Sequence, residues 1–302
     1  MQEGVQWTNL TRPEIAAGLN EEGYPVSVTV VDHLLDWAGL GYRKPQKTKT
    51  MTEHRMRNAQ FEHIAELKQL FMKSGEPVVS MDTKRREILG DYARSGRVLS
   101  SAALRAWDHD FLTHSHGVVI PHGIYDLGLN EGYIHLGTSH DTSTFAADCL
   151  LDYWRTYGHR RYPGADTLLL LCDAGGSNSC RRLLFKEELQ RVADLTGLCL
   201  RVAHYPTGCS KYNPIEHRLF PHITRVCQGM FLTGLEQVLE LMRKAVTTTG
   251  LHTFVRTIRR IYQTGKKSLV TAADQLCITF DKFIPEWNYI VFPKRIWEVI
   301  KS

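Results

Sequence analysis

The sequence predicts an α/β fold in which a mixed β-sheet is flanked by helices, with a small helical module before it. Between residues 76 and 230, short apolar runs bounded by glycine, proline or charged residues alternate with segments of helical periodicity. The predicted order is β-β-β-α-β-α-β-α, which is typical of a mixed sheet covered by helices. Residues 1–42 lack such runs and instead show two helices with recognisable N-terminal caps.

The N-terminal module is predicted to be a helix, a turn and a second helix over residues 8–40. Thr11 can cap the first helix, and Glu14 stands three residues later as its capping-box partner. Ser27 can cap the second helix. This arrangement suits a helix-turn-helix module whose second helix enters the major groove of DNA, but a plain two-helix hairpin would show the same pattern.

Residues 43–75 are predicted to be a basic linker followed by a connecting helix. Residues 41–57 contain six basic residues and one acid, and residues 60–73 have the apolar spacing of an amphipathic helix. Cations in such a segment can replace counterions at DNA phosphates, whereas a solvated linker is the alternative interpretation. The candidate DNA contacts are Arg43, Lys44, Lys47 and Lys49.

Two of the predicted strands end at an acid. Residues 78–81 form a short apolar run that leads to Asp82, and residues 168–172 form a run that leads to Asp173. The second run is apolar throughout, which predicts a strand buried on both faces. The two glycines at residues 175–176 then allow a sharp and close turn before a helix.

A third acid, Glu216, lies on a predicted helix that follows the strand at residues 198–203. Glu216 is one position away from the apolar stripe of this helix, so it stands at the edge of a packed face. The stripe consists of Ile215, Leu219, Ile223 and Val226.

Three carboxylates on separate elements suit hard, oxygen-preferring cations such as magnesium. Two such ions about 4 Å apart can activate a water or hydroxyl and stabilise the leaving oxygen of a phosphodiester. A single acid at a strand end is more often a helix cap or a turn former, however. The spacing of Asp82, Asp173 and Glu216 therefore leaves both interpretations open.

The remaining elements complete the sheet and its cover. Residues 117–127 and 132–137 are predicted to be two strands around a turn, and residues 142–157 a helix with Asp141 as its N-cap. Residues 231–302 are predicted to be a basic and aromatic extension.

Within this extension, residues 243–267 carry seven basic residues and no acid, which favours contact with a DNA backbone over a solvated face. Arg259 and Arg260 are the candidate contacts. The last segment is rich in aromatic residues, and Trp287 and Tyr289 are expected to lie in the core.

Composition sets broad limits on function. The chain has 302 residues and a formal net charge of +5, a mild basic bias that is consistent with a polyanionic partner. Its seven cysteines are scattered and form no CxxC motif, which indicates reduced thiols in the cytoplasm. No apolar run is long enough to span a membrane, and the N-terminus has no signal-peptide pattern, so we expect no membrane association.

Residues 213–216 read NPIE, and with other stretches they resemble the Rhodopirellula transposase family, an insertion-sequence family of DDE-type transposases. The matching stretches occur in one order over nearly the whole chain. They are WTNL at residues 7–10, PVVSMDTKRRE, HGIYDLGLNEGY, HDTSTFA, DAGGSN, ELQRVADLTGL, SKYNPIEHRLF, TTTGL and EWNY at residues 286–289.

This resemblance implies an RNase H-like catalytic domain over residues 76–230, in which Asp82, Asp173 and Glu216 hold Mg²⁺ ions that Mn²⁺ can replace. It also implies that water nicks double-stranded DNA at a transposon end, and that the freed 3′-hydroxyl then attacks a target. Lys211 and His217 beside the third acid are candidate DNA contacts. Assembly of two ends requires a homo-oligomer, and the protein is expected to be cytoplasmic and associated with the nucleoid.

Two alternatives remain at this stage. One is a catalytically inactive or domesticated DNA-binding remnant, and the other is an RNase H-like nuclease without strand transfer. Members of the family usually carry a further N-terminal region before the WTNL stretch, and this chain starts almost at that point. The resemblance therefore implies an N-terminally shortened member.

Overall fold

The protein is described by a computed structural model. The described residues are 5–44, 55–266, 268 and 275–301. The chain divides into two compact units, Met1–Met51 and Thr52–Ser302. Among the described residues, the structure contains no helix with the length and apolar character needed to cross a membrane.

The first unit contains two helices, α1 (Arg12–Glu21) and α2 (Val28–Trp37). Both predicted caps are confirmed: Thr11 and Glu14 form a capping box on α1, and the Ser27 side chain accepts a hydrogen bond at the start of α2. The described residues that this unit buries are Ala16 and Val31. The helices are therefore as expected, and their role as a helix-turn-helix DNA reader stays a prediction.

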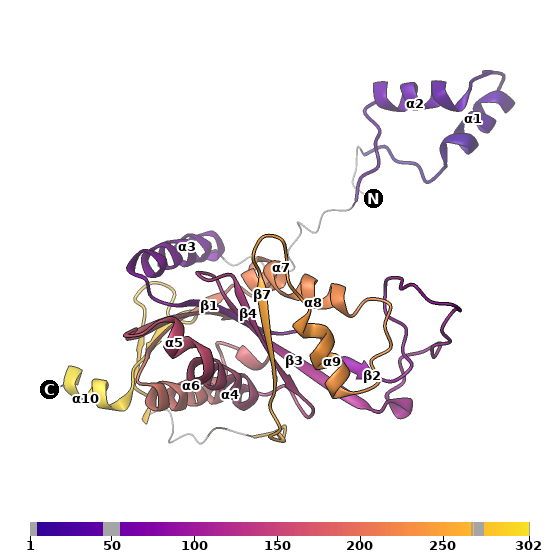
Figure 1. Ribbon diagram of the computed structural model, residues 1–302. Coiled ribbons are helices and arrows are strands. Elements are labelled where there is room, and N and C mark those ends of the chain that lie inside the picture. The colour runs from indigo at the N-terminus through magenta and orange to yellow at the C-terminus, as the bar shows by residue number, and fades with distance from the viewer. Residues whose placement is uncertain (1–4, 45–54, 267, 269–274, 302) are drawn as a thin grey trace. The chain divides into compact units, whose positions relative to one another are not determined.

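The second unit is built on a nine-stranded mixed sheet with the order β7-β4-β3-β1-β5-β6-β9-β8, in which β2 pairs with β3 (Figure 1). The strands are β1 (Val78–Thr83), β2 (Glu87–Leu89), β3 (Gly117–Asp126), β4 (Glu131–Gly137), β5 (Thr167–Asp173), β6 (Cys199–Tyr205), β7 (His252–Thr257), β8 (Ile278–Phe280) and β9 (Asn288–Val291).

Strand direction identifies the type of sheet. β1, β3 and β4 form an antiparallel meander, and β5 and β6 continue the sheet parallel to β1. Each crossover between parallel strands carries a helix, as such connections require. The predicted RNase H-like mixed sheet flanked by helices is confirmed.

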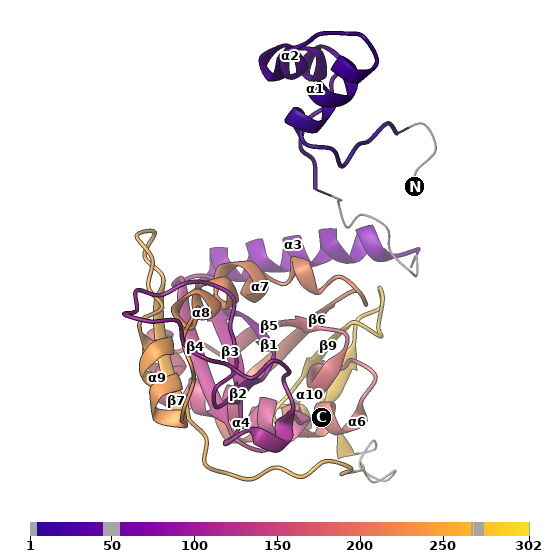
Figure 2. The same cartoon turned by 90° about the vertical axis from the view of Figure 1, so that its right-hand side faces the viewer.

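Helices cover both faces of this sheet. α4 and α6 lie on one face, and α3, α7 and α8 lie on the other (Figure 2). The helices of this unit are α3 (Arg57–Ser74), α4 (Ser143–Tyr153), α5 (His159–Arg161), α6 (Leu183–Thr196), α7 (Pro214–Arg218), α8 (Phe220–Val226), α9 (Leu235–Arg243) and α10 (Lys294–Lys301).

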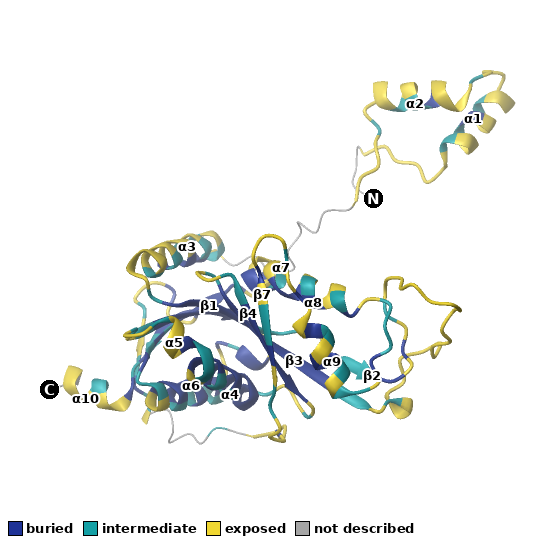
Figure 3. Ribbon diagram, viewed as in Figure 1, coloured by how far each residue is buried: buried dark blue, intermediate teal, exposed yellow. Residues whose placement is uncertain are grey.

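The strands assign alternate side chains to the two faces. On β1, Val79 and Met81 join the core under α4 and α6, whereas Val78 joins the core under α3 with Leu169 and Leu171 of β5. β5 is buried through its apolar run, as predicted for a strand covered on both faces (Figure 3). Every second residue along β1 from Val78, and along β5 from Leu169, therefore faces α3 and α7.

The helix that carries the third acid differs from the prediction. One helix was expected through residues 215–226, but α7 ends at Arg218 and α8 begins at Phe220, with Leu219 at φ −123° between them. Pro221 explains the break, because a proline inside a helix lacks an N–H and its ring collides with the carbonyl four residues earlier. The apolar stripe is nevertheless packed as predicted, since Ile215, Leu219 and Ile223 are fully buried.

The C-terminal region contributes strands to both edges of the same sheet. β7 pairs in parallel with β4, and β9 pairs antiparallel with β6. Trp287 and Tyr289 are buried, which confirms their predicted place in the core. The described strands of the C-terminal region therefore belong to the same sheet as the strands of residues 76–230.

Candidate active site

Two of the predicted acids stand side by side at one edge of the sheet. β1 and β5 run parallel, and the last paired residues in their register are Met81 and Cys172. Asp82 and Asp173 come directly after this pair, at the carboxyl ends of neighbouring strands. Asp82 shares the face of Val78, and Asp173 shares the face of Leu169 and Leu171, so both point toward α3 and α7.

The third acid reaches this edge because α7 and α8 sit very close to the sheet. Gly123 of β3 is the register partner of Asp82. A Cβ at Gly123 would lie 2.7 Å from the Phe220 ring and 2.8 Å from Ile215 Cδ1, so only glycine leaves room for this approach. With the helix seated there, Glu216 lies close enough to Asp82 and Asp173 for its charge to raise the pKa of both. The structure thus brings Asp82, Asp173 and Glu216 together.

Burial disfavours the charged form of all three acids, and neighbouring carboxylates add to this effect for Asp82 and Asp173. Burial and then the charge of Asp173 raise the pKa of Asp82 to about 8. Burial and then the charge of Glu216 raise the pKa of Asp173 to about 6. Burial also raises the pKa of Glu216, although the charge of His217 opposes this shift. Because the pKa of Asp82 is raised to about 8, the unliganded site retains a proton near neutral pH.

Thr83 connects this group to a fourth acid. Its N–H donates to Asp82 Oδ1 at 2.7 Å, and its hydroxyl donates to Asp141 Oδ1 at 3.0 Å. The prediction that Asp141 caps α4 is wrong, because Thr142 is the N-cap and accepts from the Phe145 N–H at 3.1 Å. The Asp141 carboxylate is directed instead toward the site, where its charge adds to the rise in the pKa of Asp82.

The donor set fits a hard divalent cation. All three acids offer carboxylate oxygens, which Mg²⁺ and Mn²⁺ prefer, and a bound cation would stabilise the charged forms that the site alone disfavours. Among the described residues, no three His, Cys, Asp or Glu side chains already stand in a geometry that could hold a metal ion. The fit therefore rests on ligand chemistry and on the raised pKa values.

Two further residues of this site escaped the sequence prediction. Ser80 and Asn213 are fully buried and hydrogen-bonded to each other beside Asp173. The available signals were weak: Ser80 precedes Asp82 by two positions, so it shares its face, and Asn213 stands before Pro214 at a helix start.

The predicted DNA contacts occupy different settings. Lys211 and His217 are exposed and flank the helix start that carries Glu216. Arg259 is exposed, whereas Arg260 pairs with Asp148 Oδ2 at 2.9 Å. In the first unit Arg43 and Lys44 are exposed, and Lys47 and Lys49 lie outside the described residues. None of these positions is tested as a DNA contact.

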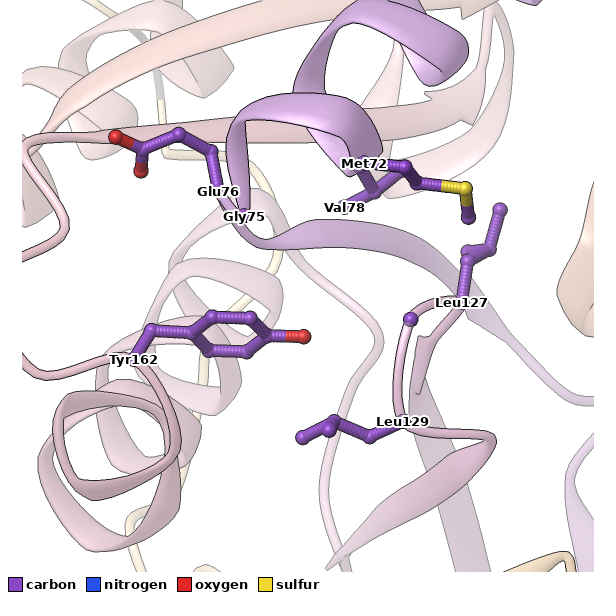
Figure 4. Close-up of a pocket in the computed structure, with 8 residues that line it drawn as sticks. Met72, Gly75, Glu76, Val78, Leu127, Leu129 and Tyr162 are labelled. Carbon is purple, nitrogen blue, oxygen red and sulfur yellow. The ribbon is translucent and has the colours of Figure 1, made fainter.

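A pocket of about 350 Å³ lies at the other end of β1 from the three acids, where β1 begins and a turn connects β3 to β4 (Figure 4). Its lining is mostly apolar and does not include the three acids. The lining residues are Met72, Gly75, Glu76, Val78, Leu127, Gly128, Leu129 and Tyr162.

Residues 1–293 match the family model described as the Rhodopirellula transposase DDE domain. The chain belongs to this family of DDE transposases. No curated protein matches the transposase in sequence.

Several solved structures resemble the transposase. A Mos1 transposase paired-end complex with the left transposon end is 14% identical, covers 80% of this chain and 72% of that one, and has a TM-score of 0.48. A mariner Mos1 paired-end complex with Mg is 16% identical at the same coverage and TM-score. A Mos1 mariner paired-end complex with Mn is 13% identical over 79% of this chain and 72% of that one, with a TM-score of 0.45.

Proposed function

We propose that this transposase cuts DNA at the ends of an insertion sequence and joins the freed ends to target DNA. Asp82, Asp173 and Glu216 would hold two divalent cations, Mg²⁺ with Mn²⁺ able to replace it. The observation that carries the proposal is the convergence of three carboxylates from β1, β5 and α7, each with a raised pKa. Membership of the DDE transposase family supports the same reaction class.

The chain's own contribution to the reaction is placement and proton release. Asp82 and Asp173 project from adjacent strands of a rigid sheet, so the register of β1 and β5 fixes the relative positions of their backbones. When bound, the cations would supply activation of a water or 3′-hydroxyl nucleophile and charge stabilisation for the leaving oxygen. Because Asp82 has a pKa of about 8, the site must release protons to bind them.

The substrate would be double-stranded DNA, both at the element's ends and at the target. The exposed basic side chains Lys211 and Arg259, together with the basic segment that includes Arg43 and Lys44, could contact its phosphates. Bringing two ends to one target requires at least two copies of the protein, so the active complex would be a homo-oligomer. A DNA substrate would place the protein at the nucleoid.

The test is cleavage of a plasmid that carries the gene with its native flanking sequences. Purified protein is incubated with Mg²⁺ or Mn²⁺, with Ca²⁺ as a non-catalytic control, and wild type is compared with Asp173→Asn. Asp281→Asn serves as the matched control, because Asp281 pairs with Arg201 away from the three acids. Cuts at the borders of the element that disappear only in Asp173→Asn would support the proposal.

Two other outcomes would overturn it in favour of a different function. Binding to the flanking sequences without any cut would indicate a DNA-binding remnant. Cuts scattered without regard to the borders, and no joined product, would indicate a plain nuclease.

A further inference from the structure

An asparagine at the start of α7 does not cap its own helix. Asn213 occupies the N-cap position, where an asparagine side chain ordinarily accepts a hydrogen bond from the second or third N–H of the helix. No such bond is present in α7. The Asn213 side chain is fully buried, and its Nδ2 instead donates to Asp173 Oδ1 at 3.4 Å. A residue suited to capping is thus used on a candidate metal ligand.

The missing cap is supplied from another element. Ser80 of β1 is fully buried, and its hydroxyl accepts a hydrogen bond at 3.1 Å from the N–H of Ile215, the second residue of α7. The same hydroxyl donates to Asn213 Oδ1. Ser80 is two residues before Asp82 and points to the same face of the sheet, so the strand that carries one acid holds the first turn of the helix that carries another.

Two uncharged side chains therefore bridge all three elements of the site. Ser80 is fixed to β1, Asn213 is fixed to α7, and the Asn213 amide reaches Asp173 on β5. Each buried polar atom in this chain of bonds has its partner in the next element, so removing one member leaves a buried group unsatisfied. These bonds join residues that are far apart in the sequence: Ser80 and Asn213 are separated by 133 residues, and Asn213 and Asp173 by 40.

We propose that Ser80 and Asn213 are positioning residues, which set the mutual placement of Asp82, Asp173 and Glu216 for metal binding. This inference rests on the proposed function, since it assumes that the three acids bind the cation. Residues that orient metal ligands through hydrogen bonds typically change metal affinity or activity by about 10- to 100-fold when they are removed. Loss of the Asn213 amide would free the Asp173 carboxylate to rotate, and loss of the Ser80 hydroxyl would free both the amide and the first turn of α7.

The experiment measures Mn²⁺ affinity by calorimetry on the full-length protein, together with the melting temperature. The variants are Asn213→Ala, Ser80→Ala and the double variant, with Asp173→Asn as a reference that lacks a ligand. Asn288→Ala is the matched control, because Asn288 is also fully buried and hydrogen-bonded, with Gln60 and Ile284 as partners.

We expect Asn213→Ala and Ser80→Ala each to weaken Mn²⁺ binding by about tenfold. The double variant should lose little more than Ser80→Ala alone, because loss of the Ser80 hydroxyl already frees the Asn213 amide that contacts Asp173. Asn288→Ala should lower the melting temperature but leave the Mn²⁺ affinity as in wild type. In the cleavage assay, saturating Mn²⁺ should restore most of the rate of Ser80→Ala, as a loss of positioning predicts and a loss of folding does not.

Wild-type Mn²⁺ affinity in both Asn213→Ala and Ser80→Ala would overturn the inference while leaving the proposed metal site intact. If Asn213→Ala does not fold, Ser80→Ala decides the question, because it removes only one oxygen atom. Failure of the wild type to bind Mn²⁺ would refute the proposed function itself, and the inference with it. Wild-type protein that binds Mn²⁺ but cuts no DNA would refute only the proposed reaction, since the affinity comparison still holds.

Discussion

Substitution of Asp173 by asparagine should abolish DNA cleavage and yet stabilise the metal-free protein. In the folded state the pKa of Asp173 is raised to about 6 by burial and by the charge of Glu216. The protonated carboxyl therefore stabilises the fold at low pH, and this contribution is lost as the pH rises from near 4 through about 6. Asparagine keeps the shape and the acceptor for Asn213 Nδ2 but carries no charge at any pH.

The gain in stability of Asp173→Asn can be calculated from the rise in the pKa of Asp173. The rise from 3.8 to about 6 corresponds to at most about 3 kcal/mol at alkaline pH. Asp173 is partly exposed, and solvent screening together with relaxation of the neighbouring acids reduces this to about 1 to 2 kcal/mol. For a unit of this size that gain raises the melting temperature by roughly 2 to 8 °C.

The assay is thermal unfolding in EDTA at about pH 8 and about pH 4.5. Asp173→Asn should melt above wild type at the higher pH, and this difference should be much smaller at the lower pH. Asp281→Asn should behave in the opposite way at the higher pH. Burial raises the pKa of Asp281, but the hydrogen bonds and charges of Arg201, Phe283 and His63 together lower it. An Asp173→Asn protein that is less stable than wild type at about pH 8 would refute the view that the acids repel one another without metal.

Three further predictions concern the contact of α7 with Gly123, the binding of metal, and the contact of Arg259 with DNA. Gly123→Ala should lower the free energy of unfolding by about 1 to 3 kcal/mol and slow cleavage, because the added Cβ displaces α7. Gly234→Ala is the control, because a Cβ there would have no neighbouring atom within 4 Å. Equal melting temperatures for the two variants would contradict this prediction. Mn²⁺ should raise the melting temperature more at about pH 8 than at about pH 5.5, because at the lower pH it must displace a proton from Asp82. An equal rise in melting temperature at the two pH values would argue against metal binding at Asp82. Arg259→Ala should reduce the slope of log DNA affinity against log salt concentration by about 0.9, as measured by fluorescence anisotropy. Arg260→Ala should change this slope less, because the guanidinium of Arg260 already pairs with Asp148. A larger change in Arg260→Ala than in Arg259→Ala would disprove the assignment.

The central strands could be predicted because their signals are local. The apolar run at residues 168–172 is long enough to indicate a strand buried on both faces, and the two runs at residues 117–127 and 132–137 are separated by a plain turn. The outer strands β7 and β9 could not be assigned, because each depends on a partner far away in sequence. The break between α7 and α8 could have been found from Pro221 alone.

The three acids of the candidate site could be proposed from the sequence, whereas the residues that hydrogen-bond to them could not. Asp82 and Asp173 end apolar runs, and the NPIE stretch adds Glu216, so sequence alone proposes all three. The bonds of Ser80 and Asn213 depend on how closely α7 approaches β1 and β5, which is decided by packing at distant positions such as Gly123. The local signal even misleads there, because an asparagine before a helix predicts a cap.

The most direct test of the central claim is to locate bound metal by the anomalous scattering of Mn²⁺ in crystals of the protein with a DNA end. The account predicts two peaks about 4 Å apart at the carboxyl ends of β1 and β5. The carboxylate oxygens of Asp82, Asp173 and Glu216 should lie about 2.1 Å from them. Mn²⁺ bound elsewhere, with these three carboxylates free of metal, would contradict the account.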